Sequence, residues 1–551
     1  MAALVATSCA ADLGTPEVPD DGPPLPLTPD GKLDGASFEA YGPLPEGPWR
    51  DEPFQALFAP DDPVVTLELS EIQRVRDARL ADPAAYAEGD NPYRIRYAVY
   101  NLRNPDLVGA LADAQDDGVD VQVLIDADQL DPARDYNVAD EQLVARGFEL
   151  VTDHRALDDA TRRTADLIGI VSSGLMHLKT RIFETPAGSV VLSGSFNPGD
   201  NAVLNEETFH RITDPTLVAR YTAAYESVLR GERIANTWDD AAAVNVLFTP
   251  AASGPRAGGR LLSWIAEEDE LILLMVFSLR DITGEGASGS LVDALGERAR
   301  AGVPVYVITD RKQSDGVDAN DEPIYANDGT EDRLRAAGVH VFEATNRRTE
   351  FTAMHHKVGI FGLSSIRVVT DAANWTFAGL GSSTRVARNY ESQLFIDTEA
   401  LDGGRTGRRY LAQWLRVLER YAEQSAGDGE PSFDEVATAL RGLPAWPRQE
   451  VVFTTTAETS FGESVYARGD QPALGDWDGL GLPLATDGDH YPRWESAPVA
   501  LPLGIAFEWK LTASYGDAGS VRWENGRNRV TFVQPAPLAV TDALVLDGPW
   551  R

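Results

Sequence analysis

The chain has 551 residues, of which 43% are hydrophobic, and it is therefore long and apolar enough to form several folded domains. Its 86 acidic residues outnumber the 48 basic ones and give a formal net charge of -38, which repels polyanions and makes non-specific nucleic-acid binding unfavourable. The single cysteine, Cys9, excludes an intrachain disulfide, and no spacing of cysteine and histidine residues resembles a zinc site.

The N-terminus has features of an export signal. Residues 2–6 are small or apolar and lead to Cys9, and residues 10–30 are rich in Pro, Asp and Gly. This pattern resembles a clipped bacterial lipoprotein signal, in which lipid is attached to the cysteine, and it implies an exported protein, either lipid-anchored in the cell envelope or extracellular, with a signal remnant and tether over residues 1–50. A basic segment is absent and Ala6 stands where a larger aliphatic residue is usual, so an irregular N-terminus with an incidental cysteine is the alternative.

Two segments repeat the order strand, helix, strand. Residues 93–126 contain IRYAVYNL, a helical stretch and VDVQVLID, and residues 268–310 contain DELILLMVFSL, a helical stretch and VPVYVITD. A glycine ends each helix, and a second helix and a short strand follow in each copy. Strands that alternate with amphipathic helices predict a sheet covered by helices, so we expect an α/β fold of two homologous α-β-α halves at residues 51–240 and 241–425.

The C-terminal part of the chain has a different pattern. Residues 426–450 contain Gly, Pro and acidic residues around one short helical stretch, and we interpret them as a linker. From residue 451, short alternating strands such as VVFTTTA and FEWKLTA are separated by Gly, Pro and Asp. They predict an all-β, immunoglobulin-like sandwich over residues 451–536, followed by a Pro-rich tail over residues 537–551.

Each predicted half contains a histidine two residues before a lysine. These pairs are His177 with Lys179 and His355 with Lys357, in the near-copies MHLK and MHHK, although the chain has only seven histidines and five lysines. On a β-strand, side chains two residues apart project from the same face, so each pair places an imidazole beside an ammonium group. The repetition of so rare a triplet in matching contexts indicates a common function.

The residues that follow each pair are also repeated. In the first half a cluster of small residues contains Ser195 and ends at Asn197, and in the second half a similar cluster ends at Asn374. A further asparagine with a carboxylate two residues later follows in both, which supplies Glu207 and Glu391. This arrangement resembles the phospholipase D superfamily, whose members bring two His-x-Lys half-sites together across a pseudo-twofold axis into one site.

The resemblance implies a phosphodiesterase that needs neither a metal nor a cofactor. By family precedent His177 attacks phosphorus to form a phosphohistidine, and His355 protonates the leaving oxygen and then activates water. Glu207 and Glu391 would hold the imidazoles through the other ring nitrogen. The phosphoryl oxygens and the substrate would be contacted by Lys179, Lys357, Asn197, Asn374 and Ser195.

Three positions depart from the family pattern. The aspartate that usually follows the lysine by five positions is Glu184 in the first half and Gly362 in the second, and the second Gly-Ser is replaced by Asp371 and Ala372. The alternative is therefore that the halves merely retain buried polar residues from a duplication. Against it, burying two lysines and two histidines without a function is costly. We expect His356, which would face the opposite side of its strand, to be packed.

Aromatic residues of the C-terminal segment follow a second family pattern. The sequences LGDW, YPRW, FEWK and RWENGRNR resemble a family 20 starch-binding module in order and spacing. By that resemblance, Trp477 and Trp523 form a platform on which glucose rings stack, and Lys510 and Asn528 bind sugar hydroxyls. A second, looser site would contain Phe461 and Tyr491.

The sequence thus predicts a phosphodiesterase that is held on starch or a glycogen-like α-glucan by its C-terminal module. We favour a phospholipid substrate, because exported bacterial members of the superfamily act on such esters and the net acidity disfavours DNA. A lipidated N-terminus would bring the protein to a membrane surface. Two alternatives stay open: a phosphodiesterase for nucleic acid or a phosphorylated glycan, and a catalytically inactive α-glucan-binding surface protein.

Overall fold

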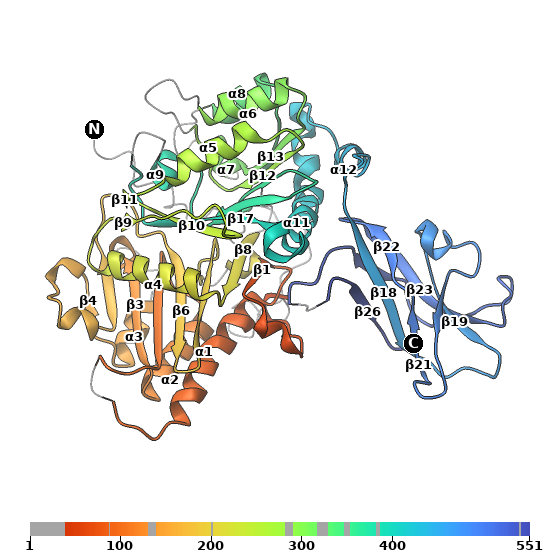
Figure 1. Ribbon diagram of the computed structural model, residues 1–551, viewed down its shortest axis with the longest axis horizontal. Helices are drawn as coiled ribbons and strands as arrows, with labels where there is room; N and C mark the ends of the chain where they lie inside the picture. The colour runs from red at the N-terminus through yellow and green to blue at the C-terminus, as the bar shows by residue number, and fades with distance from the viewer. Residues whose placement is uncertain are drawn as a thin grey trace.

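A computed structural model describes residues 39–86, 89–130, 139–199, 202–281, 290–316, 329–345, 353–381, 386–538 and 541–551. Cys9 and most of the predicted tether lie outside these ranges, so lipid attachment stays a prediction. No helix within the described ranges combines the length and apolarity needed to cross a bilayer. Figure 1 shows two stacked α/β lobes and an all-β module beside them.

The first lobe is built on one mixed sheet. Its strand order is β1 (Phe54–Ala59), β8 (Glu207–Ile212), β7 (Gly188–Gly194), β6 (Lys179–Thr185), β2 (Arg94–Val99), β3 (Asp120–Asp126), β5 (Leu167–Ile170) and β4 (Leu150–Val151). The strands from β2 to β4 pair in parallel, and those from β2 through β6 to β1 pair antiparallel. The sheet packs against α1 (Val64–Leu80) and α2 (Pro105–Asp116) on one face and α4 (Pro215–Leu229) on the other, and α3 (Ala139–Ala145) follows β3.

The second lobe repeats this topology. Its strand order is β10 (Val244–Thr249), β17 (Glu391–Asp397), β16 (Arg367–Asp371), β15 (Lys357–Phe361), β12 (Ile272–Val276), β13 (Val305–Asp310) and β14 (His340–Ala344). Its helices are α5 (Ala257–Glu267), α6 (Leu291–Arg300), α7 (Arg311–Ser314), α8 (Thr330–Ala336), α9 (Phe377–Leu380), α10 (Thr398–Asp402), α11 (Arg405–Tyr421) and α12 (Phe433–Arg441). A short parallel pair, β9 (Ile234–Ala235) and β11 (Ala251–Ser253), lies at the junction of the lobes. The predicted duplication of an α/β half is confirmed.

Local sequence signals position the crossover helices between the parallel strands. Asn104 caps α2 by accepting hydrogen bonds from two backbone N–H groups of its first turn. Ser290 caps α6 in a reciprocal capping box with Asp293. After these helices, Gly118 and Gly302 adopt φ values of 85° and 91°, which glycine reaches without the steric cost of a Cβ. The two helices therefore end just before the glycines that the sequence predicted as their ends.

Helix α11 lies where the two lobes and the β-module meet (Figure 1). Its Trp414 is fully buried and donates from Nε1 to the carbonyl of Leu274 in β12 at 2.9 Å. Arg409 donates to the carbonyl of Ala56 in β1 at 3.2 Å and to that of Pro535 in the module at 2.5 Å. One helix thus joins both sheets and the module.

The C-terminal module is the predicted all-β sandwich. Its strands are β18 (Arg448–Thr456), β19 (Ser464–Gly469), β20 (Leu482–Ala485), β21 (Arg493–Ser496), β22 (Val499–Pro502), β23 (Ala506–Ser514), β24 (Arg522–Trp523), β25 (Arg529–Phe532) and β26 (Leu544–Asp547). Phe453, Trp494 and Trp509 are buried in its core. The apolar alternation of the strands therefore fills the space between their inner faces.

Three segments differ from the prediction. The short helix expected in the linker is α12, but it is packed: its Val436 and Leu440 are buried with Leu503 of the module, because an apolar helix face covers the junction instead of staying in water. The predicted tail contains β26, which pairs in parallel with β18 and so satisfies backbone groups at that strand. Strand β5, which we did not predict, lies between β3 and β4.

A prediction follows from the close packing of β15. A Cβ added at Gly359 would lie 2.6 Å from Cη2 of the fully buried Trp375, so Gly359→Ala should lower the free energy of unfolding by about 1–3 kcal/mol. The control is Gly109→Ala in α2, where a Cβ meets no atom within 4 Å, and it should raise stability by about 0.5–1 kcal/mol. Denaturant unfolding measures both, and equal effects would contradict the packing argument.

Candidate active site

The two predicted His-x-Lys pairs meet between the lobes. His177 and His355 precede β6 and β15 and do not lie within these strands as predicted, because the chain there pairs with the other lobe. The backbone N–H of His177 donates to the carbonyl of Tyr390 at 3.0 Å, and that of His355 donates to the carbonyl of Glu206 at 3.0 Å. Each histidine is therefore placed by backbone hydrogen bonds across the lobe interface.

Each imidazole is held by a carboxylate of the opposite half. Nδ1 of His177 lies 2.7 Å from Oε2 of Glu391, and Nδ1 of His355 lies 2.8 Å from Oε2 of Glu207. The sequence predicted that these glutamates hold the imidazoles, and the structure shows that they are exchanged between halves. A contact at Nδ1 orients the ring and leaves Nε2 as its chemically available nitrogen.

Two asparagines orient the carboxylates that hold the imidazoles. Nδ2 of Asn389 donates to Glu391 at 3.1 Å, and Nδ2 of Asn205 donates to Glu207 at 3.3 Å. Oδ1 of Asn389 accepts the backbone N–H of Leu175, and Oδ1 of Asn205 accepts that of Ala353, so each asparagine also binds the other half. Both carboxylates are thus fixed by groups that also join the halves.

Ser195 binds a carboxylate of the site, and the predicted substrate contact stays a prediction. Its Oγ donates to Oε2 of Glu207 at 2.5 Å and accepts the backbone N–H of Thr208 at 2.8 Å. The hydroxyl therefore supports the carboxylate behind His355. Ala372 occupies the equivalent position in the second half and supplies no hydroxyl, so the surroundings of the two glutamates are unequal.

Burial and like charges keep both imidazoles neutral. Burial, together with the charges of Lys179 and Lys357, lowers the pKa of His177 well below its usual value. Burial and the same two lysines lower the pKa of His355 in the same way. A neutral imidazole is the form that can act as a nucleophile. Because the lysines of both halves act on each histidine, the two pairs form one site.

The lysines are buried beside their histidines. Nζ of Lys179 donates to the carbonyl of His177 at 3.1 Å, and Nζ of Lys357 donates to that of His355 at 2.8 Å. Neither lysine side chain is exposed to solvent. Two ammonium groups in a desolvated site are suited to stabilise the oxygens of a phosphoryl group.

Two aromatic rings complete the site, and the sequence analysis missed them. The ring of Tyr100 lies 5.3 Å from that of His177, and the ring of Phe277 lies 4.5 Å from that of His355. Nζ of Lys357 lies 4.9 Å from the centroid of Phe277. Both aromatics directly follow the first repeated strand, β2 or β12, and this shared position was the signal that could have identified them.

The predicted phosphoryl ligands Asn197 and Asn374 follow β7 and β16, the strands adjacent to those that begin with the lysines. Within the described ranges, the buried Oδ1 of Asn197 has no hydrogen-bond partner. The carboxylate of Asp371, noted in the sequence as a departure, accepts hydrogen bonds from Ser193 Oγ at 2.8 Å and Tyr221 OH at 2.6 Å, both of the first half. It therefore contributes another polar connection between the halves.

The remaining sequence departures lie outside the histidine cluster. Glu184 is near the far end of β6, and Gly362 follows β15 with φ 83°. His356 is packed as expected, with Nδ1 2.7 Å from Thr208 Oγ1 and its ring against Phe58. In the described part of the chain, no group of three or more histidine, cysteine or acidic residues is placed to hold a metal ion.

The predicted sugar platform of the module is present as a pair of neighbouring rings. The centroids of Trp477 and Trp523 are 6.3 Å apart, with 38° between the ring planes. Lys510 donates to the carbonyl of Gly526 at 2.7 Å, and Asn528 donates to Glu508. At the second predicted site, Phe461 is fully exposed. The backbone N–H of Thr459, close to it in sequence, donates to the hydroxyl of Tyr491. Sugar binding by these residues stays a prediction.

Two family models match the chain. The model described as "Cardiolipin synthase, PLD-like domain" matches residues 90–229 and 265–403, about half of the chain. The model of a starch-binding domain matches residues 448–541. The predicted resemblance to both families is confirmed.

Individual relatives match only part of the chain. An alpha-amylase of Streptomyces violaceus is 37% identical over 99 residues, which is 18% of this chain and 16% of that enzyme. The chain thus spans less than a fifth of the length of this curated relative. The family 20 module of a maltotetraose-forming amylase from Pseudomonas saccharophila is 31% identical, covering 18% of this chain and 99% of its own, with a TM-score of 0.15. A phospholipase D family member from Salmonella typhimurium is 19% identical, covering 32% of this chain and 95% of its own, with a TM-score of 0.22.

The buried carboxylates predict a pH dependence of stability. Burial raises the pKa of Glu391 to about 8, above the usual value of 4.5, so the folded state retains a proton that the unfolded state releases. Wild-type stability should therefore fall as the pH rises from 6.5 to 8. The window begins at 6.5 because that is the usual pKa of a histidine, so the histidines of the unfolded chain bind few protons above it. In this window Glu391→Gln should lose less stability than wild type, by on the order of 1 kcal/mol. Unfolding at several pH values measures this, and parallel profiles would contradict it.

Proposed function

Because the chain belongs to the phospholipase D-like family, we propose that it cleaves phosphodiester bonds through a phosphohistidine intermediate. The observation that supports this proposal most directly is the exchange of Glu207 and Glu391 between the halves, which fixes two neutral imidazoles in one desolvated site. Two oriented imidazoles can divide a displacement at phosphorus into two steps with lower barriers.

In the first step, Nε2 of His177 attacks phosphorus, a P–N bond forms and the P–O bond to the leaving group breaks. When Glu391 is ionised, the Nδ1–H of His177 donates to it, and the carboxylate stabilises the developing positive charge on the ring. Nε2–H of His355 protonates the leaving oxygen while its Nδ1 takes the proton of Glu207, whose pKa is raised by burial to about 8, so the ring stays neutral. The assignment of attack to His177 rests on the family resemblance.

In the second step, His355 takes a proton from water, the hydroxide attacks phosphorus and the P–N bond breaks. This releases a phosphate monoester, and His355 regains its Nε2 proton while its Nδ1 proton returns to Glu207. Lys179 and Lys357 stabilise the charge that develops on the phosphoryl oxygens in both steps. Preorganised charges act strongly here, because their side chains are shielded from water.

The substrate we propose is a phospholipid headgroup ester. The net charge of -38 disfavours nucleic acid, which would have to approach against long-range repulsion. The starch-binding domain favours one alternative, a phosphodiester carried by an α-glucan. We further propose that the protein is exported and lipid-anchored at Cys9, where it would act near a membrane surface.

The module would localise the enzyme on starch or a glycogen-like α-glucan. The neighbouring rings of Trp477 and Trp523 offer apolar faces to glucose rings, and Trp523 is 40% exposed. Helix α11 holds the module against both lobes through Arg409. Glucan binding would therefore place the catalytic halves at a defined position relative to the bound chain.

Replacing His177 with Ala should abolish phosphodiester hydrolysis in EDTA, with a loss of about 10³-fold or more, because the nucleophile is removed. The matched control is His340→Ala, a half-exposed histidine that contacts Glu430 and should retain activity. The assay compares choline release from phosphatidylcholine vesicles, plasmid nicking and hydrolysis of a glucan phosphodiester. Activity on the vesicles alone supports the lipid proposal, and activity on another ester identifies that substrate instead.

A p-nitrophenyl phosphodiester should trap the intermediate in His355→Ala. Such a leaving group needs no protonation, so the first step proceeds, whereas water is no longer activated in the second. An acid-labile phosphorylated peptide containing His177 should accumulate, detected by mass spectrometry under alkaline conditions. The absence of labelled His177, with hydrolysis intact in wild type, would contradict the covalent mechanism.

Replacing both Trp477 and Trp523 with Ala should abolish retention on amylose, because the stacking surface is lost. Hydrolysis of a soluble phosphodiester by this double variant should stay within about twofold of wild type, since the module lies outside the histidine cluster. The control is Tyr515→Ala, an exposed aromatic of the same module. If the double variant is retained on amylose as strongly as the control, the proposed platform is wrong.

A further inference from the structure

A cavity of about 560 Å³ opens on the first lobe, away from the catalytic histidines. It lies between α1, the hairpin that joins β6 and β7, and the start of α4, and three of its lining residues are Arg50, Arg74 and Arg211. Arg74 contacts the end of β6 through Thr185. Because Lys179 begins the same strand, the cavity is on the order of 20 Å along β6 from the catalytic end.

Three guanidinium groups converge on one buried carboxylate at this cavity. Glu71 is contacted by Arg50 at 2.9 Å, by Arg74 at 2.6 Å and by Arg211 at 3.1 Å. In the described ranges, none of the three arginines forms an ion pair with any other carboxylate, and the nearby Asp214 instead caps α4. The cluster therefore carries two positive charges in excess, in a chain whose net charge is strongly negative.

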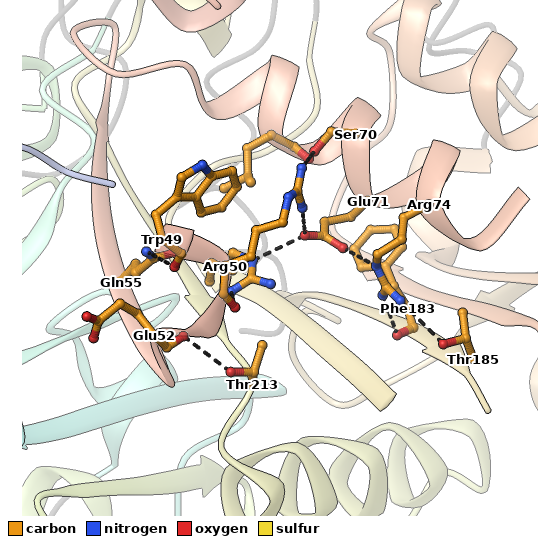
Figure 2. A network of polar contacts seen from close by, with 12 residues as sticks. Trp49, Arg50, Glu52, Gln55, Ser70, Glu71, Arg74, Phe183, Thr185 and Thr213 are labelled. Atoms are coloured by element: carbon orange, nitrogen blue, oxygen red, sulfur yellow. Dashed lines mark hydrogen bonds and ion pairs between the residues drawn. The ribbon is translucent and has the colours of Figure 1, made fainter. Parts of the chain in front are cut away.

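The arginines are held in place before any ligand binds. Figure 2 shows Arg50 and Arg74 on either side of Glu71, with Arg74 also bonded to Phe183 and Thr185. Arg211 is 4% exposed and donates from Nη1 to the carbonyl of Arg50 at 3.1 Å. Side chains that are already ordered lose little entropy when they bind an anion.

Ionisation of the shared carboxylate is favoured by this arrangement. Burial opposes the charge of Glu71, but Arg74 and Arg211 outweigh it and hold the pKa of Glu71 below its usual value. The carboxylate therefore stays charged near neutral pH and anchors the guanidinium groups. The exposed fractions of Arg50 and Arg74, 39% and 29%, leave both groups accessible from the solvent side.

The second lobe shows that the fold does not require arginine here. Phe395 occupies the position equivalent to Arg211, four residues after the glutamate of the site. Its ring packs 5.2 Å from Trp264 and 5.5 Å from Trp238. The same topology is thus completed by aromatic packing in one lobe and by a buried cation in the other. Since burying a guanidinium is costly, the cation indicates a use in binding.

We propose that this cavity binds a phosphate monoester in its dianionic form. A monoester carries about -1.5 to -2 charges at pH 7, which matches the two excess positive charges, whereas a diester carries only one. Guanidinium groups match the geometry of phosphate oxygens through paired N–H donors. The lining by Val190 and Val218 offers apolar contact to the carbon side of the ester. The site is separate from the proposed catalytic centre and does not depend on its activity.

Calorimetric titration with ethyl phosphate tests this proposal in the full chain carrying Lys179→Met, which removes one phosphate-binding cation from the catalytic centre. Arg50→Gln should weaken binding about tenfold, because one charge-assisted contact is lost. The matched control is Arg146→Gln, an arginine of the same lobe that is 42% exposed and paired with Asp113 and Asp116. It should leave binding unchanged, and diethyl phosphate should bind more weakly than ethyl phosphate.

Two sources of the monoester can be distinguished in the same variants. Sedimentation with phosphatidylcholine vesicles that contain phosphatidic acid tests a lipid monoester, and ethyl phosphate tests a free one. If Arg50→Gln does not fold, Arg74→Gln replaces it, and circular dichroism checks each variant. Binding that is equal in Arg50→Gln and Arg146→Gln, or equal for monoester and diester, would overturn the proposal, as would the absence of binding to both sources.

Discussion

The hydrogen bonds that cross between the halves at His177 and His355 are the constraint on which the site depends. Each imidazole is oriented by a glutamate of the other half, and the asparagine behind that glutamate accepts a backbone N–H of the half that provides the imidazole. A single half would leave a buried carboxylate without its partner, at a cost of several kcal/mol. The duplicated fold therefore forms one site only when both halves are docked.

Desolvation gives the shared site its chemical character. Lys179 and Lys357 are buried close enough to the imidazoles to depress the pKa of both, so the rings stay neutral while the ammonium groups provide positive charge for an anionic substrate. Helix α11 maintains this geometry, because its Trp414 and Arg409 bind the sheets of the two lobes. Arg409 of the same helix also donates to the carbonyl of Pro535 in the starch-binding domain, so this domain packs against the lobes that form the site (Figure 1).

The two halves keep one backbone topology but differ in polar detail. Ser195 supports Glu207, whereas its counterpart Ala372 cannot support Glu391. Arg211 lines a cavity in the first lobe, whereas Phe395 is packed among tryptophans in the second. These differences cost little in fold stability, because each lobe satisfies its own polar groups or fills its own space. They allow a symmetric scaffold to provide unequal histidine environments and, in the first lobe, this arginine-lined cavity.

The sequence by itself determined the duplicated α/β halves, the β-sandwich and the residues of the two half-sites, because periodicity, capping residues and the spacing of His177, Lys179, His355 and Lys357 are local signals. It did not reveal that the glutamates are exchanged, that Ser195 binds a carboxylate, that α12 packs at the junction or that three arginines meet at Glu71. Only the tertiary structure decided these features, since they depend on how separate strands and helices face one another, across more than a hundred residues of sequence for the exchanged glutamates and for Arg211 with Glu71, and no local pattern encodes that orientation.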